Sequence, residues 1–188
     1  MHGVIFNPTE NGHSENGKTK PMKNISIQQI TEQEYDKIKP LADTIWHICY
    51  KDILSEDQIK YMLDMMYCVD VISKECSQKV RYCYILDEGK TAGFLAWGPC
   101  EKDNHTAKLH KLYLLPQKQG SGIGGAAIKL VKKDVKSAGF TRLQLNVNRR
   151  NANALKCYQK NGFQIIRQED NAIGSGYYMN DFVMESCL

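Results

Sequence analysis

The chain has 188 residues, 42% of them hydrophobic and 24% charged, which suits one globular domain with a core of its own. It has no run near the ~20 apolar residues of a membrane helix and no leader typical of a signal peptide, which predicts a cytoplasmic protein without membrane contact. Of its 25 Lys and Arg residues, 12 lie between Lys108 and Lys160 against one acid, Asp134, so this region favours an anionic ligand.

The N-terminal part of the chain changes character before the first periodic segment. Residues 1–22 are rich in Asn, Gly, Lys, Glu and Ser without periodicity, which predicts a disordered or loosely attached extension before one domain over residues 23–188. ISIQQI at 25–30 alternates and predicts a strand. TEQE at 31–34 has the pattern of a capping box, so a helix is expected to begin there.

Two or three helices are expected next. Pro40 would break the first of them, which we expect to restart there and to bury a face that ends at Cys49. Ser55 is expected to cap a second helix, whose apolar residues recur at helical spacing. A third, short helix is expected over residues 71–78.

The middle of the chain predicts a hairpin and a further strand. The hairpin strands are expected at residues 81–86 and 91–98, around the turn DEGK. Residues 99–107 are expected to form a loop. KLHKLYLLP at 108–116 then predicts a strand that ends at a proline.

The last part of the chain alternates between helices and strands. Apolar residues from Ile123 recur at helical spacing until AGF ends the helix near Gly139. The elements expected after it are a strand at 142–147, a helix at 151–162, a strand at 163–168, a polar loop at 169–176 and a strand at 177–185. The order predicts a mixed α/β or α+β single domain without internal repeats.

The seven cysteines are odd in number, form no C-x-x-C pair and mostly stand among apolar residues. This pattern fits reduced thiols better than a disulfide framework or a zinc site, so no metal is expected.

The stretch QKQGSGIGG, residues 117–125, places four glycines between a strand and a helix. Glycine is unfavourable inside regular structure, so four together need a reason. The free amides and the dipole at a helix N-terminus attract anions, and missing side chains let a pyrophosphate approach them. The alternative is close packing of the helix on the sheet, a role that Gly125 could fill alone.

Two nucleotide-binding motifs fail on spacing. Gly120, Gly122 and Gly125 formally satisfy G-x-G-x-x-G, but no acid for a ribose stands about 20 residues onward. A phosphate-binding P-loop needs G-K-[ST], and two alanines follow Gly125 instead.

Two motifs together resemble a known family. Gln117 to Gly122 match the Q/R-x-x-G-x-G/A signature of the GNAT N-acetyltransferases. Downstream, the family run N-x-x-A-x-x-x-Y-x-x-x-G-F is matched by Asn151, Ala154, Tyr158, Gly162 and Phe163. The resemblance covers all but the N-terminal extension. It implies the single-domain acyl-CoA N-acyltransferase fold, a mixed, mostly antiparallel sheet of about seven strands flanked by helices.

The same resemblance implies acetyl transfer from acetyl-CoA to a primary amine by direct attack. The pyrophosphate of coenzyme A would bind the glycine segment, and its pantetheine arm would lie along the preceding strand. The positions implied to bind coenzyme A are Leu112, Tyr113, Leu114, Gln119, Gly120, Ser121, Gly122, Ile123, Gly124, Asn151 and Lys160. A plain helix N-cap is the alternative role for Asn151.

Two catalytic residues follow from the resemblance. Tyr158 matches the family's general acid, which protonates the departing thiolate, although core packing could also explain a tyrosine there. The family's base often comes from the strand before the glycines, commonly as glutamate; here that strand offers His110. A surface histidine and a water chain to solvent are the alternatives.

The acceptor is the least determined part of the prediction. CYKDILSEDQIKYML at 49–63, LYLLPQKQGSGIG and the C-terminal YYMNDFVMES resemble the PaiA-type polyamine acetyltransferases, with His110 as the departure. Tyr50, Asp52, Glu56 and Asp57 would suit a cationic amine such as spermidine or spermine, although acids at a helix start are also common.

Other functions stay open. They are acetylation of a protein N-terminus or lysine, and a non-catalytic module that senses coenzyme A. Nucleic-acid binding is not expected, because the basic region lacks interleaved aromatic residues. A homodimer is left open.

Overall fold

The computed structural model describes residues 24–101 and 103–188. The predicted extension at residues 1–22 therefore lies outside the described residues. In chain order the elements are β1 (Ile25–Gln29), the 3₁₀ helix η1 (Glu32–Lys37), α1 (Ile38–Cys49), α2 (Glu56–Tyr67), α3 (Val69–Ser77), β2 (Arg81–Asp87), β3 (Lys90–Cys100), β4 (Asp103–Leu114), the 3₁₀ helix η2 (Pro116–Lys118), α4 (Ile123–Ser137), β5 (Arg142–Asn148), α5 (Ala152–Lys160), β6 (Gln164–Gly174) and β7 (Tyr177–Cys187).

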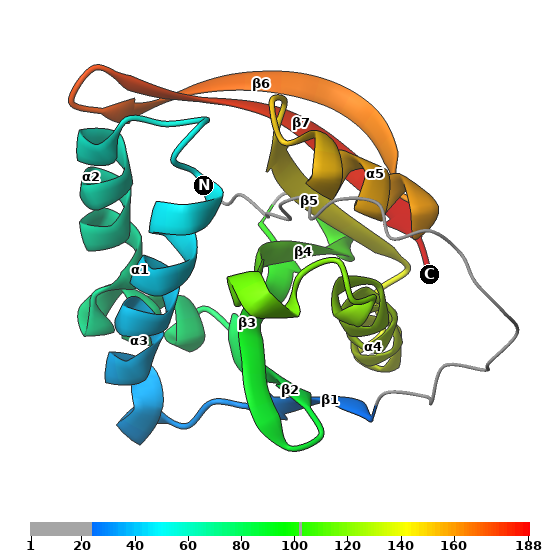
Figure 1. The fold of residues 1–188 in the computed structure, drawn as a ribbon. Helices are drawn as coiled ribbons and strands as arrows, with labels where there is room; N and C mark the ends of the chain where they lie inside the picture. The colour runs from blue at the N-terminus through cyan, green and yellow to red at the C-terminus, as the bar shows by residue number, and fades with distance from the viewer. Residues whose placement is uncertain (1–23, 102) are drawn as a thin grey trace, which may run out of the picture.

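The strands form one sheet of seven, in the order β1-β2-β3-β4-β5-β7-β6. Every neighbouring pair is antiparallel except β4 and β5, which run parallel. Figure 1 shows α1, α2 and α3 together on one side of the sheet and α4 and α5 on the other. The expected α+β fold with a mostly antiparallel sheet of about seven strands is confirmed.

Two hydrophobic cores, one on each face, hold the helices to the sheet. Leu109, Leu112 and Leu114 of β4 pack with α4 and α5. Phe94 of β3 and Tyr113 of β4 pack on the other face with α1, α2 and α3. Each strand thus contributes alternate side chains to the two cores, because successive side chains of a strand point to opposite faces.

The helix starts follow the capping signals. The backbone N–H of Thr31 donates to the Glu34 carboxylate at 3.2 Å, as in a capping box, and Ser55 Oγ accepts from Gln58 N at 3.2 Å. The helix does not break at Pro40 as predicted; the change from η1 to α1 comes earlier, between Lys37 and Ile38. The chain first forms η1, and Pro40 lies inside the first turn of α1, where a missing N–H is tolerated.

Two predicted loops are largely strand. Residues 99–107 were expected as a loop, but β3 extends to Cys100 and β4 begins at Asp103, with Asp103 accepting from Thr106 and Arg142. The polar loop expected at 169–176 is mostly the end of β6, which pairs with β7 as far as Gly174. As an edge strand exposed along most of its length, β6 lacks the alternation by which a half-buried strand is recognised.

Candidate functional site

A gap between β4 and β5 lies at the centre of the candidate site. The parallel ladder joins Thr106–Leu109 to Arg142–Leu145 and ends there. From Lys111 to Leu114, β4 pairs with β3 on one side, and it has no ladder with β5 on the other. The register between β3 and β4 also shifts between Ala96 and Trp97, which leaves His110 as a bulge. The β5-facing edge of β4 can therefore pair with an extended ligand.

The glycine segment forms a tight turn at the end of β4. Gly120 has φ +68 and Gly122 has φ +86, a left-handed conformation that glycine adopts without strain. Nothing lies within 4 Å of a Cβ built on Gly122, so the backbone shape and not packing requires this glycine. The amides of the first turn of α4, from Ile123, have no acceptor within the helix and are suited to an anion.

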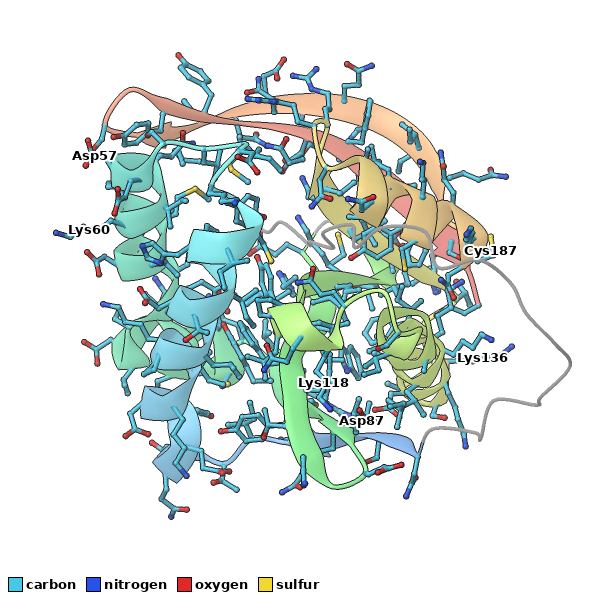
Figure 2. All side chains as sticks on the ribbon, in the orientation of Figure 1. Asp57, Lys60, Asp87, Lys118, Lys136 and Cys187 are labelled. Carbon is cyan, nitrogen blue, oxygen red and sulfur yellow. The ribbon has the colours of Figure 1, made fainter. Side chains whose placement is uncertain are left out.

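Side chains around the turn fix its shape. Gln119 Nε2 donates to Leu114 O at 3.0 Å and to Cys49 Sγ at 3.0 Å. Ser121 Oγ donates to Lys118 O at 2.6 Å. Lys118 Nζ lies 2.9 Å from Asp87 Oδ2, a pair marked in Figure 2, and ties the turn to β2.

The expected coenzyme A positions on β4 can act only through their backbones. The side chains of Leu112, Leu114 and Ile123 are buried in the core with α4 and α5, and that of Tyr113 in the opposite core. Gly124 is also buried, in the first turn of α4. These residues offer peptide groups to a ligand, as the predicted pairing with a pantetheine arm requires.

Asn151 and Lys160 stand at opposite ends of α5. Asn151 is buried and caps the helix, with Oδ1 accepting from Ala154 N at 3.1 Å. Lys160 is exposed in the last turn. The next residue, Asn161, would lie 3.5 Å from a Cβ on Gly125, which places the end of α5 beside the start of α4. The backbone at Lys160 is therefore close to the start of α4, and its side chain is exposed to solvent.

Tyr158 is fully buried on α5, with its ring 5.5 Å from that of Phe163. Its hydroxyl has no hydrogen-bond partner among the described residues. Burial, with smaller effects of Cys157 and Tyr113, raises the pKa of Tyr158 well above its usual value. The phenol therefore keeps its proton across the physiological range and has an unused donor.

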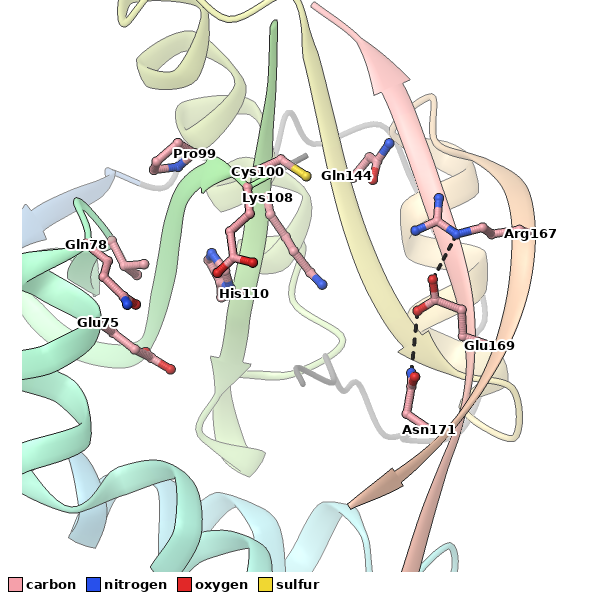
Figure 3. A pocket seen from close by; sticks show the side chains of 12 residues that line it. Glu75, Gln78, Pro99, Cys100, Lys108, His110, Gln144, Arg167, Glu169 and Asn171 are labelled. Atoms are coloured by element: carbon pink, nitrogen blue, oxygen red, sulfur yellow. Dashed lines mark hydrogen bonds and ion pairs between the residues drawn. The ribbon is translucent and has the colours of Figure 1, made fainter. Parts of the chain in front are cut away.

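His110 lines a cavity of about 530 Å³ with Lys108 of the same strand. Figure 3 shows both side chains directed into this cavity. Glu75 and Gln78, from the end of α3, lie on one side of them, and Glu169 lies on the other. Burial, followed by the charges of Lys111 and Lys108, lowers the pKa of His110 to about 2. The imidazole is therefore neutral at physiological pH and a weak base.

A buried polar group on β5 and β7 was not anticipated from the sequence. Asn146 and Asp181 are 4% and 1% exposed, on the sheet face that carries α1. Asn146 Nδ2 donates to Glu169 Oε2 at 3.2 Å, and Arg167 Nε donates to the other Glu169 oxygen at 2.8 Å. An available signal was an acid at 181 sharing a strand face with the apolar Met179 and Val183.

The expected acceptor region splits in two. Tyr50 is buried against Trp46, with ring centroids 4.5 Å apart, and Trp46 lies 5.8 Å from Tyr113. The acids expected beside Tyr50 are exposed instead, and Asp57 projects from the outer side of α2 (Figure 2). Asp52 contacts Arg150 through its backbone carbonyl, which accepts a hydrogen bond from the guanidinium. The structure thus brings the aromatic residues to the site and leaves those acids outside it.

The described residues contain no group of three or more His, Cys, Asp or Glu arranged to hold a metal. Within residues 24–101 and 103–188, no helix has the length and apolar character needed to cross a bilayer.

A protein-family comparison identifies the chain. The model described as Acetyltransferase (GNAT) family matches residues 41–163. The chain belongs to the GNAT acetyltransferase family. This family agrees with the predicted class of enzyme, an acetyl-CoA-dependent N-acetyltransferase. The domain bounds 23–188 stay a prediction.

Individual proteins of the family share only about a quarter to a third of their residues with this chain over the matched regions. The chain is 26% identical over 163 residues to a spermidine N(1)-acetyltransferase of Thermoplasma acidophilum, covering 86% of this chain and 96% of that one. It is 35% identical over 82 residues to an uncharacterized N-acetyltransferase of Mycobacterium tuberculosis, over 44% of this chain. It spans about half, 52%, of the length of that mycobacterial relative.

Solved structures agree on the fold. A PaiA N-acetyltransferase from Thermoplasma acidophilum in complex with coenzyme A has a TM-score of 0.72 at 23% identity, covering 88% of this chain and 99% of that one. The ribosomal-protein-S18-alanine N-acetyltransferase of Escherichia coli has a TM-score of 0.64 at 15% identity, covering 87% and 93%. Both solved structures thus share this architecture.

Proposed function

We propose that this protein transfers the acetyl group of acetyl-CoA to a primary amine of a small polycation of the polyamine class. The observation that carries the proposal is the gap between β4 and β5, which opens along the stretch of β4 that leads into the glycine turn. The buried Tyr158 hydroxyl, on the helix that follows β5, has no hydrogen-bond partner among the described residues. A cofactor held at the turn and laid along the gap would bring its thioester toward that hydroxyl.

Coenzyme A would bind through peptide groups more than through side chains. The amides from Gln119 to Gly124 would receive the pyrophosphate, with the Lys160 ammonium close by. The pantetheine amides would pair with the β5-facing edge of β4 beyond the end of its ladder to β5, as an added strand does. Asn151 would steady the arm while capping α5. The PaiA relative was solved in complex with coenzyme A, which supports coenzyme A as the ligand.

Tyr158 would supply the proton for the leaving group. The amine nitrogen forms a bond to the thioester carbon, the carbon–sulfur bond breaks, and the phenol O–H protonates the sulfur as it departs. The raised pKa of Tyr158, caused first by burial, keeps the phenol in the acid form that this step needs. His110 stays a prediction as the base, and its lowered pKa makes it a poor one.

Two observations support a polycationic acceptor. The cavity beside the gap is lined by three acids, Glu75, Glu101 and Glu169, together with Lys108 and Arg167. Behind the lining, the hydroxyl of the buried Tyr82 donates to the Glu75 carboxylate, which holds that acid in place. The relative named as a spermidine N(1)-acetyltransferase, matched over most of both chains, points to the same class of amine.

The test measures thiol release from acetyl-CoA with a panel of acceptors: spermidine, spermine, an aminoglycoside and short peptides with free N-termini. Turnover with the polyamines at a kcat/KM well above that of the peptides is expected. A preference for peptides would replace the proposal with protein or peptide acetylation. Binding of coenzyme A in calorimetry, without turnover of any acceptor, would favour a sensing module.

A further inference from the structure

Asp181 is a buried carboxylate without a structural explanation. It lies on β7, opposite Asn148 in the ladder to β5, with a residue exposure of 1%. Its Oδ1 has no hydrogen-bond partner among the described residues. Burying a charged group is strongly unfavourable unless it is paired, so such a group calls for a functional reason.

The surroundings of Asp181 combine polar groups from four elements. Asn146 of β5 donates to Glu169 of β6 and favours the charged form of Asp181. Lys108 of β4 is close enough to favour the charged form, and Glu169 to oppose it. From α1, Tyr50 is near enough for Asp181 to raise the tyrosine's pKa, after the larger effect of burial.

Asp181 adjoins the place where the reaction is proposed to occur. Tyr113 of β4 raises the pKa of both Tyr50 and Tyr158, and Asp181 that of Tyr50, so these groups interact electrostatically. Glu169 of β6 lies directly opposite Asp181 in the ladder to β7. Asn148, its partner in the ladder, lines a second cavity of about 300 Å³. Asp181 thus lies between that cavity and the larger one, to which Glu169 and Lys108 belong.

We propose that the Asp181 carboxylate binds the ammonium group of the acceptor and removes one proton from it before attack. This inference rests on the function proposed above. It assigns to β7 a catalytic residue that the sequence led us to seek at His110 on β4.

The step balances as follows. The acceptor R–NH₃⁺ gives one proton to Asp181, leaving R–NH₂ and a neutral carboxyl. The nitrogen lone pair forms the N–C bond, the C–S bond breaks, and Tyr158 protonates the sulfur. The nitrogen, now cationic, returns its second proton to the Tyr158 phenolate. Asp181 releases its proton to water in the cavity, so one proton is released for each amide formed.

The ionisation of Asp181 fits this role better than that of His110. Burial raises the pKa of Asp181 from its usual 3.8 to about 6, against opposing effects of Asn146 and Lys108. At neutral pH it is therefore ionised, yet a stronger base than an ordinary aspartate. Burial lowers the pKa of His110 to about 2, so His110 has little tendency to accept a proton.

The test compares pH profiles of kcat/KM for the wild type and Asp181→Asn. The wild type is expected to lose activity below about pH 6, where Asp181 becomes protonated. Without the base, the variant must use acceptor that is already unprotonated in solution. Below the pKa of the amine, the unprotonated fraction rises about tenfold per pH unit. Its deficit should be about 100-fold near pH 7 and shrink toward pH 10, within the range for a general base. The affinity for coenzyme A should not change.

Two control variants make the comparison specific. Glu185→Gln changes a carboxylate on the same strand and face, one that accepts from Gln144 Nε2 at 2.7 Å. It should keep the wild-type profile. His110→Ala should keep the limb near pH 6, since the pKa of His110 lies far below it. Loss of that limb in His110→Ala but not in Asp181→Asn would overturn the inference.

Thermal unfolding separates a catalytic from a structural role. The pKa of Asp181 is higher in the folded protein than in the unfolded chain. The stability that Asp181 contributes is therefore lost as the pH rises from about 4 to about 6, and it stays lost at higher pH. Asp181→Asn should therefore unfold at the same or a higher temperature near pH 8. A lower unfolding temperature there would mark a structural carboxylate and overturn the inference.

The outcomes distinguish this inference from the function on which it rests. Wild-type turnover of polyamines, with parallel profiles for Asp181→Asn and the wild type, would refute the role of Asp181 and leave the function intact. If the wild type acetylates no amine, the proposed function fails. Calorimetry of spermidine binding, with coenzyme A present, then decides on Asp181. Weaker binding to Asp181→Asn supports an ammonium site, and equal or absent binding overturns it.

Discussion

Gly93 of β3 lies directly against the carbonyl of Tyr113 on β4: a Cβ added to Gly93 would stand 2.0 Å from that oxygen. Real Cβ atoms do not approach this closely, so any side chain at 93 must push the two strands apart. We expect Gly93→Ala to lower the free energy of unfolding by about 1–3 kcal/mol, toward the upper end because backbone cannot easily yield. Denaturant unfolding measures this change.

Gly89→Ala is the control for Gly93→Ala, because nothing lies within 4 Å of its added Cβ and only its φ of +77 is strained. A cost for Gly93→Ala no larger than that for Gly89→Ala would contradict the close packing of β3 on β4.

Gly122→Ala should weaken coenzyme A binding by about tenfold, because an alanine at φ +86 strains the turn that aims the amides, by about 1–2 kcal/mol. Gly125→Ala offers a matched control, since its Cβ would meet Asn161 at an ordinary 3.5 Å. Calorimetry on both variants checks the prediction. Equal losses of affinity would indicate that packing and not backbone shape matters here.

Tyr158→Phe should reduce kcat by about 10²–10⁴ while the dissociation constant for coenzyme A stays the same. The variant should be at least as stable as the wild type, because the phenol has no hydrogen-bond partner among the described residues. In the wild type, no loss of activity from phenol ionisation is expected up to about pH 10, since burial raises the pKa of Tyr158. Wild-type kcat in the variant would remove Tyr158 from the mechanism.

Lys111→Met should destabilise the protein far more than Lys118→Met. The Lys111 ammonium is fully buried and lies 2.7 Å from Glu75, whose side chain is 21% exposed, so its removal leaves a shielded carboxylate without a counter-charge. A loss of about 3 kcal/mol is typical of a broken buried pair, against at most about 1 kcal/mol for a more accessible one such as Lys118 with Asp87. Similar losses in chemical denaturation would show that burial of Lys111 does not set its contribution.

The sequence was informative wherever one short segment determined the structure. The glycines before Ile123 predicted the turn and the helix start, because backbone conformation is local. Ser55 and Asn151 predicted helix starts for the same reason. The family match needed the glycine turn and the run around Tyr158 together, since each alone is compatible with ordinary packing.

The features that the sequence did not reveal depend on neighbours distant in the sequence. The strand character of residues 169–174 comes from pairing with β7 and not from their own polar side chains. The setting of Asp181 requires β5, β6 and β7 to be placed side by side, which no local pattern encodes. The environment of His110 likewise arises from the cavity around it, so its residue type suggested a base that its surroundings disfavour.

The sheet is joined at its middle by four residue pairs, Thr106–Leu109 with Arg142–Leu145, fewer than at any other strand junction. Arg142 reinforces this seam, with Nε donating to Thr106 Oγ1 at 3.1 Å and a further bond to Asp103. The seam and the opening beside it are made by the same two strands. The rigidity of the short β4–β5 ladder and the width of the opening beside it are therefore coupled. A substitution that weakens the ladder also changes the shape of the opening.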